Sequence, residues 1–222
     1  MGIKLGSTDI SKVFVGSTAA QKVYLGSTQV WSSQIVYDAT GAGKEQSSGA
    51  TAAYSHTIAG NAILCAVETK AASGVTAKVG ATPVNVLATV NTGTASVYLW
   101  VFGLVDPPTG AQTINLAGLG ANTSANSVSY KNVTSIGTAV TATGASGATE
   151  TVTASSAPGK MVFNAMAMLN NSAPAYNQTQ RSLLFTSGTD YPLLLGDAPG
   201  ASSVTFSCAS SAAWAAVAVP LS

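Results

Sequence analysis

Short apolar runs separated by turn-forming residues make up most of this chain. From position 32 on, runs rich in Val, Ile, Leu, Phe and Tyr alternate with Gly, Asn, Pro, Ser and Thr. Such runs, bounded by turn residues, predict β-strands, and strong helix formers are too scarce to sustain a long helix. The pattern therefore predicts an all-β, antiparallel β-sandwich. We expect its strands at 35–37, 54–58, 62–69, 76–79, 82–90, 96–105, 110–116, 124–130, 149–154, 161–168, 181–186, 204–207 and 214–219.

Three segments carry more specific expectations. Nearly every position of 161–168 is apolar, which predicts a strand buried on both faces, as in a two-layer sandwich. One face of 124–130 is polar, which predicts an outer or edge strand. Residues 138–149 are almost wholly Gly, Ala, Ser and Thr, and they predict a loop or a flat strand with little to bury.

A ten-residue repeat occupies residues 1–31, ahead of the sandwich domain expected over 32–222. Gly-Ser-Thr recurs in register at 6–8, 16–18 and 26–28. Each unit predicts a short strand followed by a turn, so together they predict a small β-meander. Chains below roughly 40 residues seldom bury a core alone, so the meander should pack on the following domain or serve oligomerisation and anchoring. The candidate assembly-interface residues are Phe14, Tyr24 and Trp31.

The charge content narrows the possible functions. Nine Lys or Arg and eight Asp or Glu leave a net charge of +1, too little basic excess for a nucleic-acid partner. The apolar runs fall far short of the roughly 20 residues of a membrane span, and no signal-peptide core is visible. We therefore expect a soluble protein made in a cytoplasm, with no membrane partner. Few charges also leave Ser, Thr and Ala surfaces that neighbours can cover with little desolvation.

Groups suited to catalysis are scarce, so we expect no enzyme, no cofactor and no catalytic or metal site. His56 is the only histidine, and its strand context predicts a half-exposed structural role. A Ser-His-Asp arrangement stays an alternative, because any serine could approach His56, although no Gly-x-Ser-x-Gly elbow is present. The scattered acids do not suggest a glycosidase pair. A calcium ion near Asp190 or Asp197 is a further alternative.

Two cysteines and two tryptophans lie in apolar, strand-like runs. Cys65 and Cys208 predict two small core residues, with a disulfide joining two sheets as the alternative. Trp100 predicts a core position, and Trp214 a core or interface position.

The repeat, ending in Val30-Trp31, resembles strand-turn repeats near the ends of many tailed-phage virion proteins, minor tail proteins among them. The order of segments over about 37–220, most specifically the Pro-Pro-Thr-Gly-Ala-Gln-Thr-Ile stretch at 107–114, resembles a jelly-roll β-sandwich domain of phage tail proteins and secreted bacterial surface proteins.

This resemblance implies a non-catalytic structural or adhesive protein. The expected role is a virion structural protein of the minor tail or capsid-decoration type, assembled in the host cytoplasm and able to contribute to host attachment. Its expected partners are other virion proteins and further copies of the chain, with a trimer fitting phage symmetry. The alternative is a carbohydrate-binding module for a host cell-wall or capsule polysaccharide, a host-surface glycan that an exposed aromatic platform in a groove would recognise.

Overall fold

The computed structural model confirms an all-β protein. Within the described part of the chain the regular elements are strands, and no helix there is long and apolar enough to cross a membrane. The structure describes residues 4–5, 8–9, 13–15, 18–20, 22–25, 28–32, 34–93, 97–145, 149–169, 175–186, 191–209 and 212–222.

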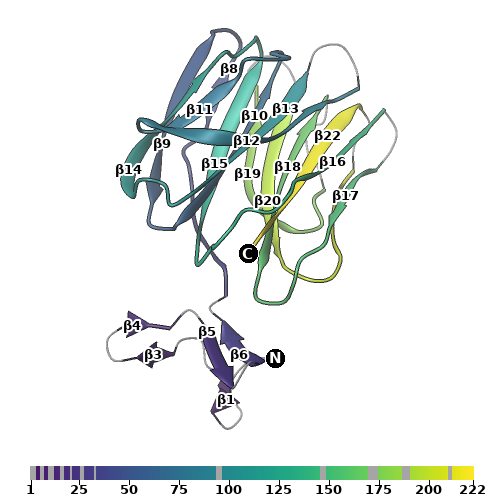
Figure 1. The fold of residues 1–222 in the computed structure, drawn as a ribbon. Coiled ribbons are helices and arrows are strands. Elements are labelled where there is room, and N and C mark those ends of the chain that lie inside the picture. Colours follow the sequence, from purple (N-terminus) through teal and green to yellow (C-terminus); the bar gives the residue numbers. More distant parts are fainter. Residues whose placement is uncertain are drawn as a thin grey trace.

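The first sheet has nine antiparallel strands and curls until it is nearly closed (Figure 1). The amide of Ala42, which follows β7 (Val36–Thr40), donates to the carbonyl of Ser55 in β9 (Thr51–Ile58) at 2.9 Å and so joins the two ends of the sheet. Its strands, in spatial order, are β7 (Val36–Thr40), β15 (Thr123–Lys131), β10 (Ala62–Thr69), β13 (Tyr98–Val105), β12 (Thr82–Asn91), β11 (Thr76–Val79), β14 (Gly110–Ala117) and β9 (Thr51–Ile58), with β8 (Lys44–Gln46) pairing β15 beside β7.

A second sheet of five strands packs against the first, and a third sheet of two strands covers its other face. The second sheet therefore has both faces buried. The prediction that 161–168 forms a strand buried on both faces is confirmed, because every residue of β18 (Met161–Met168) is buried. The second sheet consists of β16 (Val140–Gly144), β22 (Trp214–Leu221), β18 (Met161–Met168), β20 (Pro192–Pro199) and β19 (Thr179–Phe185). The third consists of β17 (Glu150–Ala154) and β21 (Val204–Cys208).

Strand alternation divides the apolar side chains among three core layers. In β10, Ile63 points into the curled first sheet, while its neighbour Leu64 points toward the second sheet. In β18, Phe163 faces the first sheet and Met166 faces the third. Successive strand residues point to opposite faces, so one strand contributes to two layers, and each large side chain buried this way stabilises the fold by about 1.5–3 kcal/mol.

The prediction of an outer or edge strand at 124–130 is wrong. Strand β15 lies between β7 and β10, and every residue from Thr123 to Tyr130 is buried. Its polar side chains are hydrogen-bonded inside: Ser124 Oγ contacts Thr186 Oγ1 at 2.8 Å, and Asn126 Nδ2 donates to Ser182 Oγ at 2.8 Å. Polar side chains with such partners can be buried, so the polar face of this strand does not face solvent.

The N-terminal repeat forms local hairpins rather than the predicted single meander (Figure 1). In each repeat the Gly-Ser pair stands between two short paired strands, and the Thr begins the second one. The described strands pair as three separate two-stranded units. They are β1 (Lys4–Leu5) with β2 (Thr8–Asp9), β3 (Phe14–Val15) with β4 (Thr18–Ala19), and β5 (Lys22–Leu25) with β6 (Thr28–Ser32).

Candidate functional site

The only histidine lies inside the molecule, so the half-exposed position predicted for it is wrong. His56 points inward from β9 and is 1% exposed. Its Nδ1 contacts Ser127 Oγ at 2.7 Å, and its Nε2 contacts Ser129 Oγ at 3.1 Å. The two serines are two positions apart in β15 and therefore present their hydroxyls on one face of that strand.

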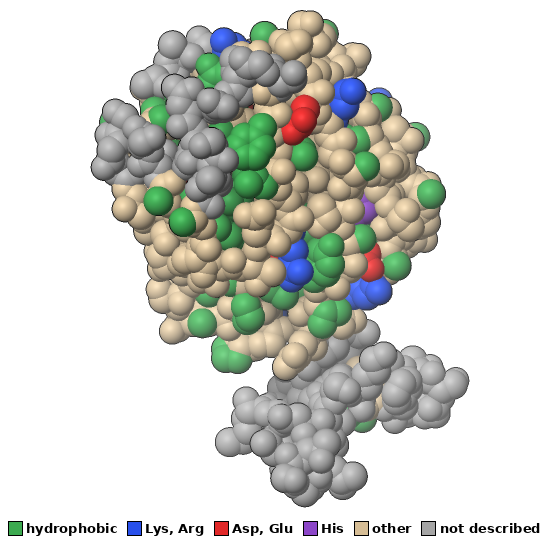
Figure 2. Space-filling view, turned by 180° about the vertical axis from the view of Figure 1, so that it is seen from behind, with side chains coloured by type: hydrophobic (Ala, Val, Ile, Leu, Met, Phe, Trp, Pro, Cys, Tyr) green, Lys and Arg blue, Asp and Glu red, His purple; other side chains and the backbone are tan. Residues whose placement is uncertain are grey.

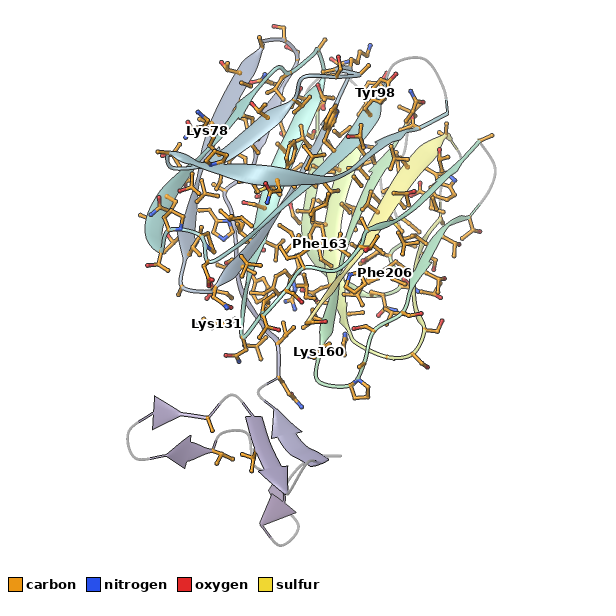
Figure 3. The ribbon with its side chains drawn as sticks, viewed as in Figure 1. Lys78, Tyr98, Lys131, Lys160, Phe163 and Phe206 are labelled. Carbon is orange, nitrogen blue, oxygen red and sulfur yellow. The ribbon has the colours of Figure 1, made fainter. Side chains whose placement is uncertain are left out.

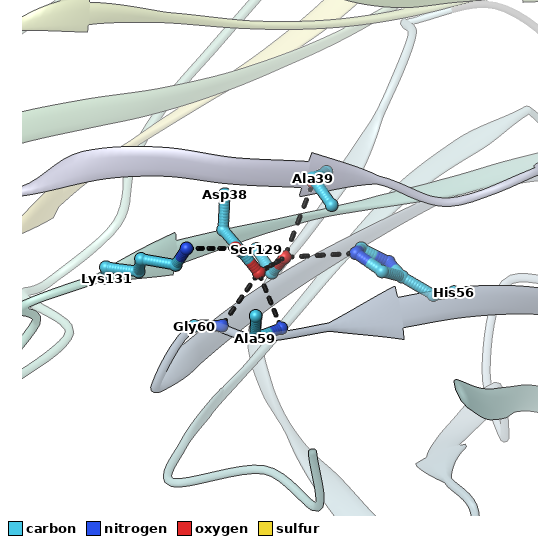
Figure 4. A network of polar contacts seen from close by, with 7 residues as sticks. All are labelled: Asp38, Ala39, His56, Ala59, Gly60, Ser129 and Lys131. Carbon is cyan, nitrogen blue, oxygen red and sulfur yellow. Dashed lines mark hydrogen bonds and ion pairs between the residues drawn. The ribbon is translucent and has the colours of Figure 1, made fainter. Parts of the chain in front are cut away.

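The network continues from Ser129 to the ionised carboxylate of Asp38, in the middle of β7 (Figure 4). Asp38 Oδ2 accepts the Ser129 hydroxyl at 2.8 Å and the backbone amides of Ala59 and Gly60 at 2.8 and 2.7 Å. Its other oxygen forms an ion pair with Lys131 Nζ at 3.0 Å. Asp38 thus holds the β9–β10 turn and the end of β15 against β7.

The proton positions in this network follow from its chemistry. A serine hydroxyl has one proton, and that of Ser129 goes to Asp38, so Ser129 accepts the N–H of His56 Nε2. His56 Nδ1 is then the acceptor of the Ser127 hydroxyl. Burial lowers the pKa of His56 to about 4 against the opposing effect of Asp38, so the ring is neutral at pH 7.

The Asp38 carboxylate stays ionised for a different reason. Burial by itself would raise its pKa, but the hydrogen bonds from Ala59, Lys131, Ser129 and Gly60 outweigh burial and hold the pKa below its ordinary value. Charge-assisted bonds of this kind favour the ionised form.

The structure brings Ser, His and Asp together, but in an order that does not activate a nucleophile. In a catalytic triad the carboxylate orients the histidine, and the histidine takes the serine proton. Here Ser129 stands between Asp38 and His56, and its proton is directed to the carboxylate. Both Ser127 and Ser129 are fully buried. The arrangement acts as a clamp that holds β7, β9 and β15 together.

A second polar cluster ties the first sheet to the second. Asp197 accepts two bonds from Arg181, at 2.8 Å from Nε and 3.0 Å from Nη2, and one from Tyr130 Oη at 3.1 Å. The Arg181 guanidinium lies 3.9 Å from the centroid of the Tyr37 ring. The Asp197 carboxylate is therefore occupied by protein donors, which speaks against the calcium alternative there. The other calcium candidate, Asp190, lies outside the described residues.

Two glutamates 82 positions apart interact in the interior, Glu68 in β10 and Glu150 in β17. Both are fully buried, and neither Glu68 carboxyl oxygen has a hydrogen-bond partner among the described residues. Burial, and then Glu150, raise the pKa of Glu68 well above its ordinary value. The described residues contain no group of three or more His, Cys, Asp or Glu side chains that could hold a metal ion.

The cysteines and tryptophans occupy core positions. Cys65 lies inside the first sheet and Cys208 between the second and third, and both are free thiols, so the disulfide alternative is wrong. Burial raises the pKa of each thiol to about 12. Trp100 is buried with Nε1 donating to the Ala71 carbonyl at 3.0 Å, and Trp214 is buried against the third sheet, so both core predictions are confirmed.

The three candidate interface aromatics are placed only as backbone. Phe14 lies in β3, Tyr24 in β5 and Trp31 in β6, and their side chains fall outside the described part of the chain. Their role at an interface stays a prediction.

Among the described residues the first sheet forms at least two surface hollows, and sequence patterns indicated neither of these. One, of about 600 Å³, is lined from β8, β9, β11 and β14 and includes Lys44 and Lys78. The other, of about 450 Å³, lies between the β9–β10 turn and the segment that begins at Lys131. The described lining of each hollow includes neither His56 nor an aromatic side chain.

Comparisons of this chain with protein-family models, with curated proteins and with solved structures find no match.

Proposed function

We propose that this protein is a non-enzymatic structural component of a tailed-phage virion, of the minor tail or capsid-decoration type. The N-terminal Gly-Ser-Thr repeat supports this role through its resemblance to virion strand-turn repeats. Virion assembly in the host cytoplasm and partnership with other virion proteins are parts of the same proposal. The jelly-roll assignment and the boundary between residues 31 and 32 rest on the sequence in the same way.

The observation that carries the proposal is how the few ionisable groups are used. Asp38 holds backbone amides and Lys131, Asp197 holds Arg181, and neutral His56 lies buried between two serines. These groups stabilise contacts between strands and sheets. The surface around them carries few charges, as the view in Figure 2 shows, and such a surface can be covered by neighbouring subunits with little desolvation.

The proposal includes a homo-oligomer, with a trimer as the expected form, assembled through the aromatics of the repeat. The full chain with Phe14, Tyr24 and Trp31 replaced by Ser should be monomeric by light scattering, while the wild-type chain is oligomeric. A control with Lys12→Ala and Lys22→Ala removes charges from the same repeats and should keep the wild-type mass. Dissociation of the wild-type oligomer in moderate salt would contradict assembly through uncharged surfaces.

The genomic setting provides the direct test of the virion role. Capsid, tape-measure or tail genes beside the coding sequence are the expected result, and an operon of metabolic enzymes would refute it.

A carbohydrate-binding role is the second candidate function, and one observation favours it. Six of the ten described residues that line the hollow beside β8 carry a hydroxyl, amide or ammonium group, and such groups suit a ligand rich in hydroxyls. Screening the wild-type chain on a glycan array tests this function, and the absence of any bound glycan would refute it.

A further inference from the structure

The larger hollow is built on the outward faces of three adjacent strands. Lys78 of β11 lies in register with Asn115 of β14, and Asn115 with Ala53 of β9. In the next row, Thr76 of β11 and Thr51 of β9 flank Ala117 of β14. Figure 1 places these strands together at one side of the first sheet, with β8 next to them. Small side chains in these rows leave a hollow that larger ones would fill.

Positive charge gathers in this hollow without a balancing carboxylate. Lys44 and Lys78 both line it, and its described lining includes no Asp or Glu. Neither lysine forms an ion pair within the part of the chain that the structure describes, whereas Lys131 and Arg181 are held by aspartates. The basic residues beyond position 33 are Lys44, Lys70, Lys78, Lys131, Lys160 and Arg181. Two of these six lysines and arginines therefore serve one hollow.

The uncharged lining is already oriented by the protein. Gln46 Nε2 donates to the Gly49 carbonyl at 3.0 Å, and Asn115 Nδ2 donates to the Gly80 carbonyl at 3.2 Å. These bonds use the amide nitrogens and leave the amide oxygens as acceptors for ligand hydroxyls. Thr51 and Thr76 add hydroxyl groups to the lining.

We propose that this hollow binds an anionic polysaccharide, one whose repeating units carry carboxylate or phosphodiester groups. Lys44 and Lys78 contact the anionic groups, and the amide and hydroxyl groups contact sugar hydroxyls. Within the described residues the lining has no aromatic ring on which a neutral sugar could stack, so the lysine charges take the place of the aromatic platform expected from sequence. The apolar residues of its described lining are three alanines and Leu116, with no aromatic among them, so the hollow offers little to anchor the large side chains of a peptide.

This inference rests on the carbohydrate-binding candidate and is independent of the virion role. Calorimetry with the full chain provides the test, using polygalacturonate as the carboxylate polymer, poly(glycerol phosphate) as the phosphodiester polymer, and dextran as the neutral polymer. We expect the wild-type chain to bind at least one polyanion and to leave dextran unbound. Which polyanion binds distinguishes the two sources of negative charge.

Lys44→Ala and Lys78→Ala should each weaken polyanion binding about tenfold, because each removes one charged contact. Lys160→Ala is the matched control, since Lys160 does not line the hollow and lies at the other end of the sandwich from Lys78 (Figure 3), and this variant should bind as the wild type does. Unchanged thermal unfolding midpoints would show that the variants are folded. Binding should also weaken as salt rises.

Three results would overturn the inference. They are binding of neither polyanion, wild-type affinity in both lysine variants, and equal affinity for a single-stranded oligonucleotide, which would indicate charge attraction alone. If the wild-type chain binds neutral glycans on the array but neither polyanion in calorimetry, the carbohydrate-binding role stands. The proposal of a site for an anionic polysaccharide is then overturned.

Discussion

Glu68 is buried where a carboxylate has little to stabilise it. It has no exposed surface, and neither carboxyl oxygen has a hydrogen-bond partner among the described residues. Burial, and then the nearby Glu150, raise the pKa of Glu68 well above its ordinary 4.5. Folding therefore binds a proton at a pH where the unfolded chain has already released it.

The pH dependence that Glu68 gives to the free energy of unfolding follows from proton linkage. Above the ordinary pKa and below the raised one, the folded protein holds one more proton than the unfolded chain, so the free energy of unfolding falls by about 1.4 kcal/mol per pH unit. Below the ordinary pKa both states are protonated and this loss is absent. Glu68→Gln keeps the size of the side chain, and the glutamine cannot ionise. The variant therefore lacks the fall in the free energy of unfolding that the ionisation of Glu68 causes as the pH rises.

Urea unfolding followed by tryptophan fluorescence measures the difference. Near about pH 4 the variant should match the wild type within about 1 kcal/mol, and it should become progressively more stable than the wild type toward about pH 8. Glu45→Gln is the control, because Glu45 is exposed and its replacement relieves no burial. Parallel pH profiles for the wild type and Glu68→Gln would refute the reasoning.

Three further changes can be measured by the same unfolding assay. Asp38→Asn should destabilise by about 1.5–3 kcal/mol at neutral pH. Because the folded pKa of Asp38 is lowered, this stabilisation is present above the ordinary 3.8 and lost as pH falls through the folded value, so the two proteins should converge in acid. Gly118→Ala should lower the free energy of unfolding by about 1–3 kcal/mol more than Gly110→Ala does. Both glycines have a positive φ, but only at Gly118 would an added Cβ meet nearby backbone atoms. Equal losses of stability in the two variants would contradict this reasoning. Phe163→Ala should cost about 3–5 kcal/mol, whereas exposed Val140→Ala should change stability by less than about 0.5 kcal/mol.

Strand positions could be predicted because their signals are local. Ala62–Thr69, Thr76–Val79 and Met161–Met168 match the predicted strands end to end. Apolar character over a few residues and turn formers at each end depend only on neighbouring positions, so the sequence displays them directly.

Strand β20 shows where local signals fail. It begins and ends with proline and contains Gly196 and Asp197, all unfavourable to strands, and the sequence pattern did not predict it. The strand forms because it pairs with β18 on one side and β19 on the other, and because its polar and glycine residues have partners there. Arg181 and Tyr130 bind the Asp197 carboxylate, and the bare Cα of Gly196 leaves room for the ring of Tyr176.

The N-terminal repeat was predicted only in part. Its ten-residue period and one strand of each repeat were visible in the sequence, but the second strand, which begins at the Thr of each Gly-Ser-Thr, and the way the strands pair were not. The predicted meander has one strand in each repeat, whereas the described hairpins have two. Which strand pairs with which depends on contacts between the strands, and the alternation of apolar and polar residues along the chain does not encode these contacts.

By itself, the sequence determined that this protein is an all-β sandwich with few charges, because strand period, turn residues and composition are properties of neighbouring or summed residues. Only the tertiary structure decided what the polar residues do. Ser127 lies 71 positions from the histidine it contacts, and Lys44 and Lys78 come to one hollow from separate strands. Burial and partnership of a polar group depend on which strands curl together, and that contact is made in space rather than along the chain.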